Sequence, residues 1–408
     1  MKRLLYLFTL LLLLSSCKKA RDVEPDPTPA TTPQTTLIYF TGTDLSSFFS
    51  QNISAAKSAI AGGALGYGRF VAFRHTSSTS GNLIEYKYDG ALCVADTLKC
   101  YTSVKSLSQE TITTVIADLK ELAPADSYNL IVSGHATAWV PQEHLSSTWR
   151  SPSAQGFINW EAMTESEIVT RYLGSKNDGY FDVDEFEESL TASNTHFGYI
   201  LFDECFMSSI EVLYALRNNS DYIIASPCEI MGAGFPYDTV LSALFSNSGS
   251  SFDLQKVCQA YLDYYSAYSI PSACVALTVT AELEPLADVI RQINSVTGDI
   301  DVDTDQLQVY ERLMDHLFFD LEDYMLAKCG DNQELKESLL AQMQRAFPEE
   351  CRLHTERFFA NIGVSASSAN NYDAYFTSID HYSGVSTSAP SLQFRSEWES
   401  TDWAKAIN

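Results

Sequence analysis

The sequence predicts an α/β protein with a mostly parallel sheet flanked by helices and a largely helical C-terminal lobe. Short apolar segments alternate with helix-like segments up to residue 240, as in strands connected by crossover helices. Beyond residue 240 the spacing of apolar residues becomes mainly helical. A chain of 408 residues, of which 45% are hydrophobic, can bury the core that such a fold needs.

The first half of the chain contains five predicted strands, a hairpin and the helices between them. Strands are predicted at residues 36–40, 70–73, 128–133, 199–202 and 222–226. Asp89-Gly90 predicts a hairpin turn between residues 83–88 and 91–95. Helices are predicted at residues 45–60, 112–122, 165–173, 184–192 and 208–217, and a long irregular insertion at residues 136–165.

The second half is predicted to be mostly helical. Helices are expected at residues 252–268, 282–296, 305–328 and 332–346. Strands are expected at residues 273–279, 356–362, 374–379 and 391–395. We therefore divide the chain into an α/β core at residues 36–240 and an α/β lobe at residues 241–408 that packs on it.

The N-terminus has the features of an export signal with a lipid attachment site. Lys2 and Arg3 precede an apolar run that is too short for a membrane span, which needs ~20 residues. Ser15-Ser16-Cys17 resembles the bacterial lipobox, so residues 1–16 are the predicted signal peptide and Cys17 the lipidated residue. The alternative is an ordinary signal peptide in which Cys17 has no role. Residues 17–35 contain four prolines and no periodicity, which predicts a disordered tether to the periplasmic or surface face of a bacterial membrane.

The charge of the chain excludes some partners. There are 26 basic and 52 acidic residues, a net charge of −26, and cleavage after residue 16 removes two basic residues and leaves 24 against 52, or −28. A body this acidic repels nucleic acid and attracts basic peptides. We therefore expect a peptide or protein substrate and no nucleic acid.

The nine cysteines predict no metal site. If Cys17 carries lipid and Cys205 is reactive, seven remain, so at least one thiol is free. Cys93 and Cys100 flank a turn-like stretch and are candidates for a disulfide. Cys351 and His354 have ligand-like spacing, but no second pair of ligands accompanies them, so we expect no structural zinc.

Two predicted strands end in residues that can react. The strand at residues 128–133 runs into Gly134-His135, and the strand at residues 199–202 runs into Asp203-Glu204-Cys205. Reactive groups of open α/β sheets gather beyond the carboxyl ends of the strands. If the two strands are neighbours, an imidazole and a thiol meet in one crevice, and the helix predicted after Cys205 directs its positive end toward the thiol. The alternative is a structural histidine and a buried core cysteine.

Several segments resemble a known family. SGHATAW at residues 133–139 resembles the histidine motif of clostripain-like cysteine peptidases, which have the caspase–gingipain type of fold, and FDECFMSSIEVLYALRN at residues 202–218 resembles their cysteine motif more closely. The stretch from residues 225–229 through residues 235–238 resembles the family segment that follows the cysteine motif, and weaker landmarks occur in the same order at residues 319–324, 382–386 and 402–403. The resemblance covers residues 36–408. It implies that His135 is the general base and Cys205 the nucleophile, with the backbone of Gly134 and Ala136 stabilising the oxyanion.

Two departures from the family pattern affect the predicted activity. The family has glycine where this chain has Ala136 and Ala138, and alanine resists a positive φ. The residue before the nucleophile is small in the family and is Glu204 here, and a carboxylate beside a thiol raises its pKa unless the side chain points away. Two interpretations follow: an active cysteine endopeptidase, or a catalytically degenerate surface lipoprotein that keeps the fold to bind peptides or partners.

The resemblance also implies a substrate preference. An aspartate at the position of Asp203 lies at the base of the family's pocket for a basic side chain, which predicts cleavage after Arg or Lys. Glu229 and Asp238 are further pocket candidates, and the alternative for Asp203 is a cap on the following helix. Relatives are often activated by cleaving the loop between the two catalytic strands, where Arg150 is the predicted self-cleavage site and Arg171 and Lys176 are alternatives.

No cofactor is expected. Residues 178–186 resemble the second half of a calcium-binding loop, but Gly174 and Lys176 occupy positions that should supply carboxylates. We interpret this segment as an acidic turn into a helix, with a weak calcium site as the alternative.

Overall fold

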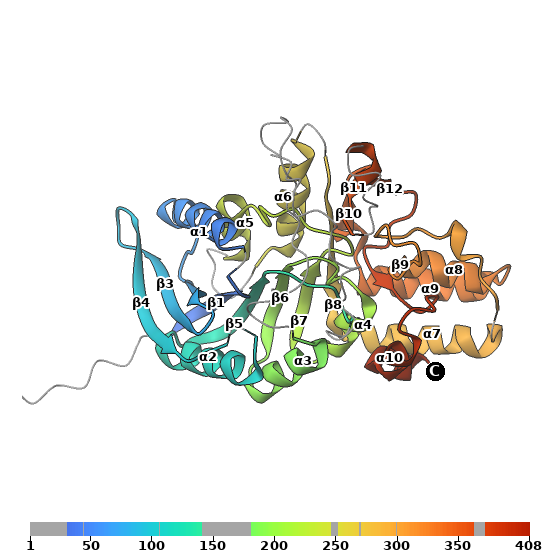
Figure 1. The fold of residues 1–408 in the computed structure, drawn as a ribbon, viewed down its shortest axis with the longest axis horizontal. Coiled ribbons are helices and arrows are strands. Elements are labelled where there is room, and N and C mark those ends of the chain that lie inside the picture. Colours follow the sequence, from blue (N-terminus) through green and yellow to red (C-terminus); the bar gives the residue numbers. More distant parts are fainter. Residues whose placement is uncertain are drawn as a thin grey trace, which may run out of the picture. The chain divides into compact units, whose positions relative to one another are not determined.

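A nine-stranded sheet runs through the described part of the chain in this computed structural model, which describes residues 31–43, 45–105, 107–140, 181–245, 252–268, 271–298, 300–362 and 372–408 (Figure 1). Its strand order is β10-β8-β7-β6-β5-β1-β2-β3-β4. The strands are β1 (Thr32–Phe40), β2 (Arg69–Ser77), β3 (Ser80–Tyr88), β4 (Cys93–Thr102), β5 (Ala125–Ser133), β6 (Phe197–Asp203), β7 (Ser220–Ala225), β8 (Cys274–Val279) and β10 (Leu353–His354). The five central strands from β7 to β2 are parallel, and the pairs at both edges are antiparallel.

Helices cover both faces of this sheet. Figure 1 shows α1 (Ser46–Ala61), α5 (Tyr237–Leu244) and α6 (Leu254–Ser266) on one face, and α2 (Gln109–Leu122), α3 (Val183–Ala192) and α4 (Ile210–Ala215) on the other. The central strands are therefore buried on both sides, which explains why they are continuous apolar runs in the sequence. This arrangement confirms the predicted α/β class with a mostly parallel sheet flanked by helices.

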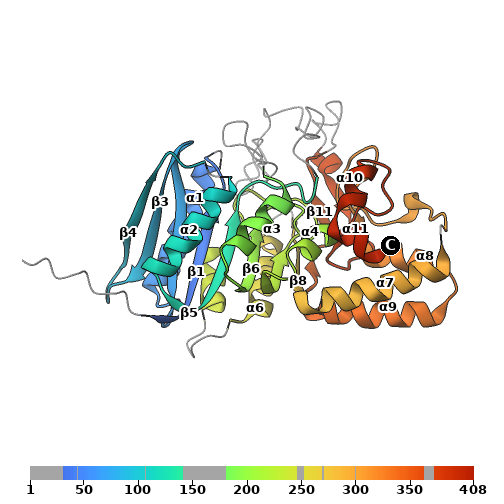
Figure 2. The same cartoon turned by 90° about the horizontal axis from the view of Figure 1, so that it is seen from below.

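The chain beyond residue 240 both completes the sheet and builds a helical region. β8 and β10 extend the sheet past β7. Figure 2 shows the antiparallel helices of the C-terminal region packed side by side beyond β8. They are α7 (Leu283–Thr297), α8 (Leu321–Cys329) and α9 (Gln333–Ala346), accompanied by α10 (Arg395–Ser400) and α11 (Asp402–Ile407). Two small antiparallel pairs join β11 (Arg357–Phe359) to β12 (Phe376–Ser378), and β13 (Ser386–Thr387) to β9 (Phe319–Asp320).

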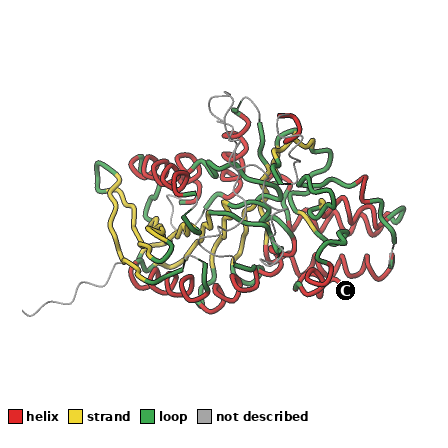
Figure 3. Tube along the Cα trace, viewed as in Figure 1, coloured by secondary structure: helices red, strands yellow, loops and turns green. Residues whose placement is uncertain are grey.

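The prediction of one helix over residues 305–328 is wrong. Figure 3 shows mostly loop before α8, which begins only at Leu321. The buried carboxylate of Glu311 accepts hydrogen bonds from the backbone N–H groups of Leu313, Leu317 and Phe318, so it gives this stretch an alternative to helical hydrogen bonds. The predicted strand at residues 391–395 is also wrong, because that stretch leads into α10, and helix α5 was not predicted.

A disulfide between Cys93 and Cys100 is excluded by the fold. Both residues lie in β4, seven positions apart along one extended strand, which corresponds to roughly 23 Å at ~3.3 Å per residue. A disulfide requires Cα atoms within ~7 Å. None of the eight cysteines in the described residues forms a disulfide. No described helix is long and apolar enough to cross a membrane, and no cluster of three or more potential metal ligands occurs among the described residues.

Candidate active site

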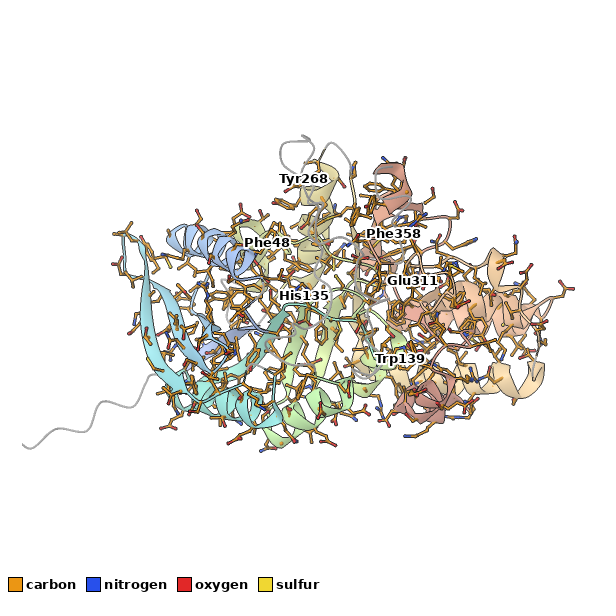
Figure 4. The ribbon with its side chains drawn as sticks, in the orientation of Figure 1. Phe48, His135, Trp139, Tyr268, Glu311 and Phe358 are labelled. Atoms are coloured by element: carbon orange, nitrogen blue, oxygen red, sulfur yellow. The ribbon has the colours of Figure 1, made fainter. Side chains whose placement is uncertain are left out.

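The candidate site is built on the pairing of β5 with β6. The two strands are adjacent and parallel, with Ser133 opposite Asp203 in the register. The backbone N–H of Gly134 also donates to the Asp203 carbonyl, at 3.4 Å. The next residues, His135 on one side and Cys205 on the other, therefore leave the sheet from neighbouring strand ends. Figure 4 shows His135 over the central strands.

Cys205 lies in a sharp, buried turn. Its side chain is fully buried, and the backbone N–H of Ile230 donates to its sulfur at 3.2 Å. Phe206 adopts a left-handed conformation with φ of 62° and stacks on Phe318, with ring centroids 4.9 Å apart. Such a conformation costs roughly 1–2 kcal/mol for a residue with a side chain. The packing of Phe206 and the hydrogen bond from its N–H to the Cys228 carbonyl, at 3.1 Å, hold the turn in place.

The position before the histidine accepts only glycine. A Cβ atom on Gly134 would lie 1.6 Å from the hydroxyl oxygen of Thr41 and 3.2 Å from Oε1 of Glu204. Thr41 is fixed because its backbone N–H donates to the Ser133 carbonyl at 2.9 Å. Any side chain at residue 134 would therefore displace the strand end that carries His135.

Of the two alanines that replace family glycines, one is strained. Ala138 has a φ of 53°, the left-handed conformation that glycine adopts without penalty, whereas Ala136 is not among the positive-φ residues of the described chain. The concern raised by the sequence therefore applies to Ala138 and not to Ala136. The backbone at Ala138 accepts the conformation despite its Cβ atom.

Glu204 lies beside the histidine segment. Its Oε1 accepts a hydrogen bond from the hydroxyl of Thr41 at 3.4 Å, and its side chain lines a pocket of about 80 Å³ together with His135 and Met207. Because β6 ends at Asp203, Glu204 already belongs to the turn that carries Cys205. From that turn its carboxylate reaches the histidine segment.

Asp203 is fully buried and does not cap the following helix. Helix α4 begins at Ile210 with Ser209 as its N-cap. The carboxylate of Asp203 instead accepts hydrogen bonds from the hydroxyls of Tyr237 at 2.9 Å and Ser133 at 3.2 Å, and from the N–H of Phe235 at 3.2 Å. These partners are compatible with an ionised carboxylate, because all three groups donate.

The other predicted site residues differ in burial, and two of them lie outside the described part of the chain. Glu229 is buried, and its Oε1 accepts the backbone N–H groups of Asn361 and Ile362, each at 2.7 Å. Asp238 is exposed in the first turn of α5. Cys17 and the predicted self-cleavage site Arg150 lie outside the described residues. The pocket roles of Glu229 and Asp238 stay predictions.

Sequence reasoning missed the residues that hold the two reactive segments. Ile230 follows Cys205 by 25 positions, and Tyr237 follows Asp203 by 34. No local spacing connects such residues. The only sequence signal for these contacts is the family-like stretch from residue 225 to residue 238, and the resemblance by itself assigns no contact to it.

Comparison with known proteins identifies close structural similarity over most of the chain. The clostripain family model matches residues 70–390. A secreted C11 cysteine protease from Bacteroides thetaiotaomicron, "iotapain", is 29% identical and covers 93% of this chain and 100% of its own, with a TM-score of 0.79. An inactive zymogen of a C11 protease from Parabacteroides distasonis is 25% identical, with 93% and 99% coverage and a TM-score of 0.72.

A third structure matches a shorter part of the chain. A clostripain from Bacteroides thetaiotaomicron in complex with the peptide inhibitor BTN-VLTK-AOMK is 31% identical and covers 58% of this chain and 99% of its own, with a TM-score of 0.50. A search of curated protein sequences finds no match.

We predict that Ala138→Gly is neutral or raises the free energy of unfolding by up to about 1 kcal/mol, because glycine relieves the left-handed strain at this position. Ala136→Gly is the matched control, and it should lower the free energy of unfolding by roughly 0.5–1 kcal/mol through added freedom of the unfolded chain. Denaturant unfolding monitored by tryptophan fluorescence measures both. Equal destabilisation by the two substitutions would contradict the prediction.

Proposed function

The chain belongs to the clostripain family of cysteine peptidases, and we propose that it acts as an endopeptidase through a dyad of His135 and Cys205. The observation that supports this assignment is the register of β5 and β6, which brings Ser133 opposite Asp203 and so starts both reactive segments at one edge of the sheet. The family model matches across both segments.

In the proposed reaction, His135 accepts the thiol proton and the Cys205 sulfur attacks the carbonyl carbon of the scissile peptide bond. The negative charge on the carbonyl oxygen is stabilised by backbone N–H groups, with Gly134 and Ala136 as the expected donors. His135 then protonates the leaving amine, and water hydrolyses the thioester. The backbone of Ile230 holds the sulfur in place, since its N–H donates to the sulfur at 3.2 Å and its carbonyl lies 3.8 Å from the sulfur as an acceptor.

The described form of the site is closed. Cys205 is fully buried, so a peptide cannot reach its sulfur without a rearrangement. We propose that the chain is made as a precursor and is activated by cleavage in the insertion between β5 and β6, with Arg150 as the cleavage site. The similarity to an inactive zymogen of a C11 protease supports this proposal.

We propose a preference for Arg or Lys before the cleaved bond. Asp203 stands two residues before the nucleophile, and a buried carboxylate selects a basic side chain by charge and hydrogen bonding. The peptide of the inhibitor bound by the related clostripain, VLTK, ends in lysine, which supports the same preference here. The acidic surface of the chain would also attract basic peptides.

We also propose that the mature protein is anchored to a bacterial membrane through lipid on Cys17. The support is the sequence of residues 1–17, where a basic start, a short apolar run and Ser15-Ser16-Cys17 occur in the order of a lipoprotein signal.

The dyad is tested with a lysine-derived covalent peptide ketone that alkylates the active-site thiol. We predict that the protein, once cut in the insertion between β5 and β6 by an added protease, is labelled once, that Cys205→Ala cut in the same way is not labelled, and that His135→Ala slows labelling by about 100-fold or more because the base is lost. Cys100→Ser removes an exposed thiol and is the matched control, which should label like the unmodified protein. Intact-mass spectrometry measures the adduct. Absence of labelling in the cut, folded protein would instead favour a catalytically degenerate relative.

The specificity is tested by Asp203→Asn, which keeps the size of the side chain but removes its charge and replaces one acceptor oxygen with an N–H donor. The ratio of kcat/KM for a lysine substrate to that for a leucine substrate should fall by about 10–100-fold, the range expected for loss of one charge-assisted hydrogen bond. Asp96→Asn, at an exposed position in β4, is the control and should leave the ratio unchanged. Cleavage only after apolar residues would disprove the proposed preference.

The anchor is tested by expressing the full chain with Cys17→Ser. The unmodified protein should partition into the detergent phase and carry a lipid mass on its N-terminal residue, whereas the variant should remain in the aqueous phase or retain its signal peptide. A water-soluble unmodified protein with a free Cys17 would show that the signal is an ordinary one.

A further inference from the structure

A chain of hydrogen bonds connects the loop that carries His135 with the helix that follows Cys205, by way of the C-terminal segment. We call residues 383–388 the clamp segment. It lies between the two reactive segments, although more than 170 positions separate it from Cys205 in the sequence. Ser386 forms a parallel bridge with Ser209, and its N–H donates to the Ser208 carbonyl at 2.8 Å.

On the histidine side, the connection is made by one side chain. Trp139 follows His135 by four positions and is 7% exposed. Its indole N–H donates to the hydroxyl oxygen of Ser388 at 2.9 Å. Figure 4 shows Trp139 on the side of the C-terminal helices, away from the central strands where His135 lies. The loop that leaves β5 is therefore anchored to the clamp segment directly after the strained residue Ala138.

On the cysteine side, the connection is a buried carboxylate. Glu211 lies in the first turn of α4 and is 2% exposed. Its Oε1 accepts the backbone N–H of Ser388 at 2.9 Å and the hydroxyl of Thr387 at 3.1 Å, and its Oε2 accepts the hydroxyl of Ser209. The same Oε1 accepts the indole N–H of Trp398 at 2.8 Å. Ser388 thus contacts both sides: its hydroxyl binds the histidine loop and its backbone binds the cysteine helix.

The clamp segment is also held by hydrogen bonds to β9 and to the turn after Cys205. Asp320 in β9 accepts the backbone N–H and the hydroxyl of Ser383 at 2.7 and 2.8 Å. The hydroxyl of Ser208 donates to the Gly384 carbonyl at 2.6 Å. Each of these groups is buried, so breaking one hydrogen bond leaves a polar atom without water. The segment therefore acts as a rigid bridge.

We propose that Trp139 and Ser388, anchored by Glu211, are positioning residues that set the place of His135 relative to Cys205. This inference rests on the proposed dyad. Proton transfer requires the imidazole within hydrogen-bonding reach of the thiol, and a displacement of ~1 Å at a reacting group costs up to about 100-fold in rate. The register of β5 and β6 places the two strand ends, while the loop after His135 bends through a left-handed residue. The hydrogen bond from Trp139 fixes that loop on the far side of the bend.

The protein contains a matched control for this idea. Trp139 and Trp398 are both buried, and each donates its indole N–H to the same network. Only Trp139 belongs to the segment that carries His135, since Trp398 lies in α10. Replacing either indole with phenyl removes one buried hydrogen bond and some packing. If both indoles have a purely structural role, the two substitutions should change stability and kcat alike. If Trp139 is a positioning residue, only its substitution should change kcat and the pH profile of the dyad.

The experiment uses the whole protein after cleavage in the insertion between β5 and β6, and compares Trp139→Phe, Ser388→Ala, the double variant and Trp398→Phe. We expect Trp139→Phe and Ser388→Ala each to lower kcat about tenfold with KM within about twofold, because binding of the substrate is left intact and only the alignment of the dyad changes. The pH profile for covalent labelling of Cys205 should move to higher pH in both. The double variant should be no worse than either single variant, because both remove the same hydrogen bond.

Trp398→Phe should lower the midpoint of thermal unfolding by a similar amount but leave kcat and the pH profile unchanged. Equal effects of the two tryptophan substitutions on kcat, or additive losses in the double variant, would overturn the clamp proposal. An unreactive Cys205 in the unmodified protein would remove the proposed dyad and this inference together. If Cys205 is reactive and Trp139→Phe keeps the kcat and pH profile of the unmodified protein, only this inference is wrong and the proposed dyad remains.

Discussion

The parallel pairing of β5 with β6 is the constraint on which the rest of the site depends. Because Ser133 lies opposite Asp203, the residues that follow each strand start from the same edge of the sheet. β6 is buried on both faces, between α5 and α6 on one and α3 and α4 on the other. A shift of the register by one residue would exchange every packed side chain of β6 between these faces, so close packing on both sides fixes the register and the strand ends that lead to His135 and Cys205.

Buried carboxylates hold the segments that the sheet does not reach. Asp203, Glu211, Glu229, Glu311 and Asp320 are at most 4% exposed, and each accepts hydrogen bonds from backbone or hydroxyl donors. The donors to Glu311 lie in its own stretch, whereas the other four accept from segments distant in the sequence. A carboxylate can accept several donors at once, and it becomes costly to bury when they are removed. Burial raises the pKa of Asp320, while the hydroxyl of Tyr310 and the N–H groups of Asp323 and Ser383 lower it. This network explains how long irregular stretches are kept in one conformation.

The parts of the structure that sequence could predict are those governed by short-range patterns. Apolar runs located the central strands, Asp89-Gly90 located the hairpin, and the rule for strand ends brought His135 and Cys205 to one edge. The failures have long-range or competing causes. Glu311 replaced helical hydrogen bonds over the stretch before α8, and the length of β4 separated Cys93 from Cys100. The bond from Trp139 to Ser388 spans 249 positions, so no periodicity could have indicated it.

The placement of Glu204 changes what this residue implies for the chemistry. As a neighbour of the nucleophile in sequence, its carboxylate was expected to oppose formation of the thiolate. In the fold, it receives the hydroxyl of Thr41 and lines one pocket with His135. The hydrogen bond from Thr41 and the shared pocket place the Glu204 carboxylate beside the segment that carries His135. Its influence on the proposed reaction therefore acts through the histidine as well as through its position next to Cys205 in the sequence.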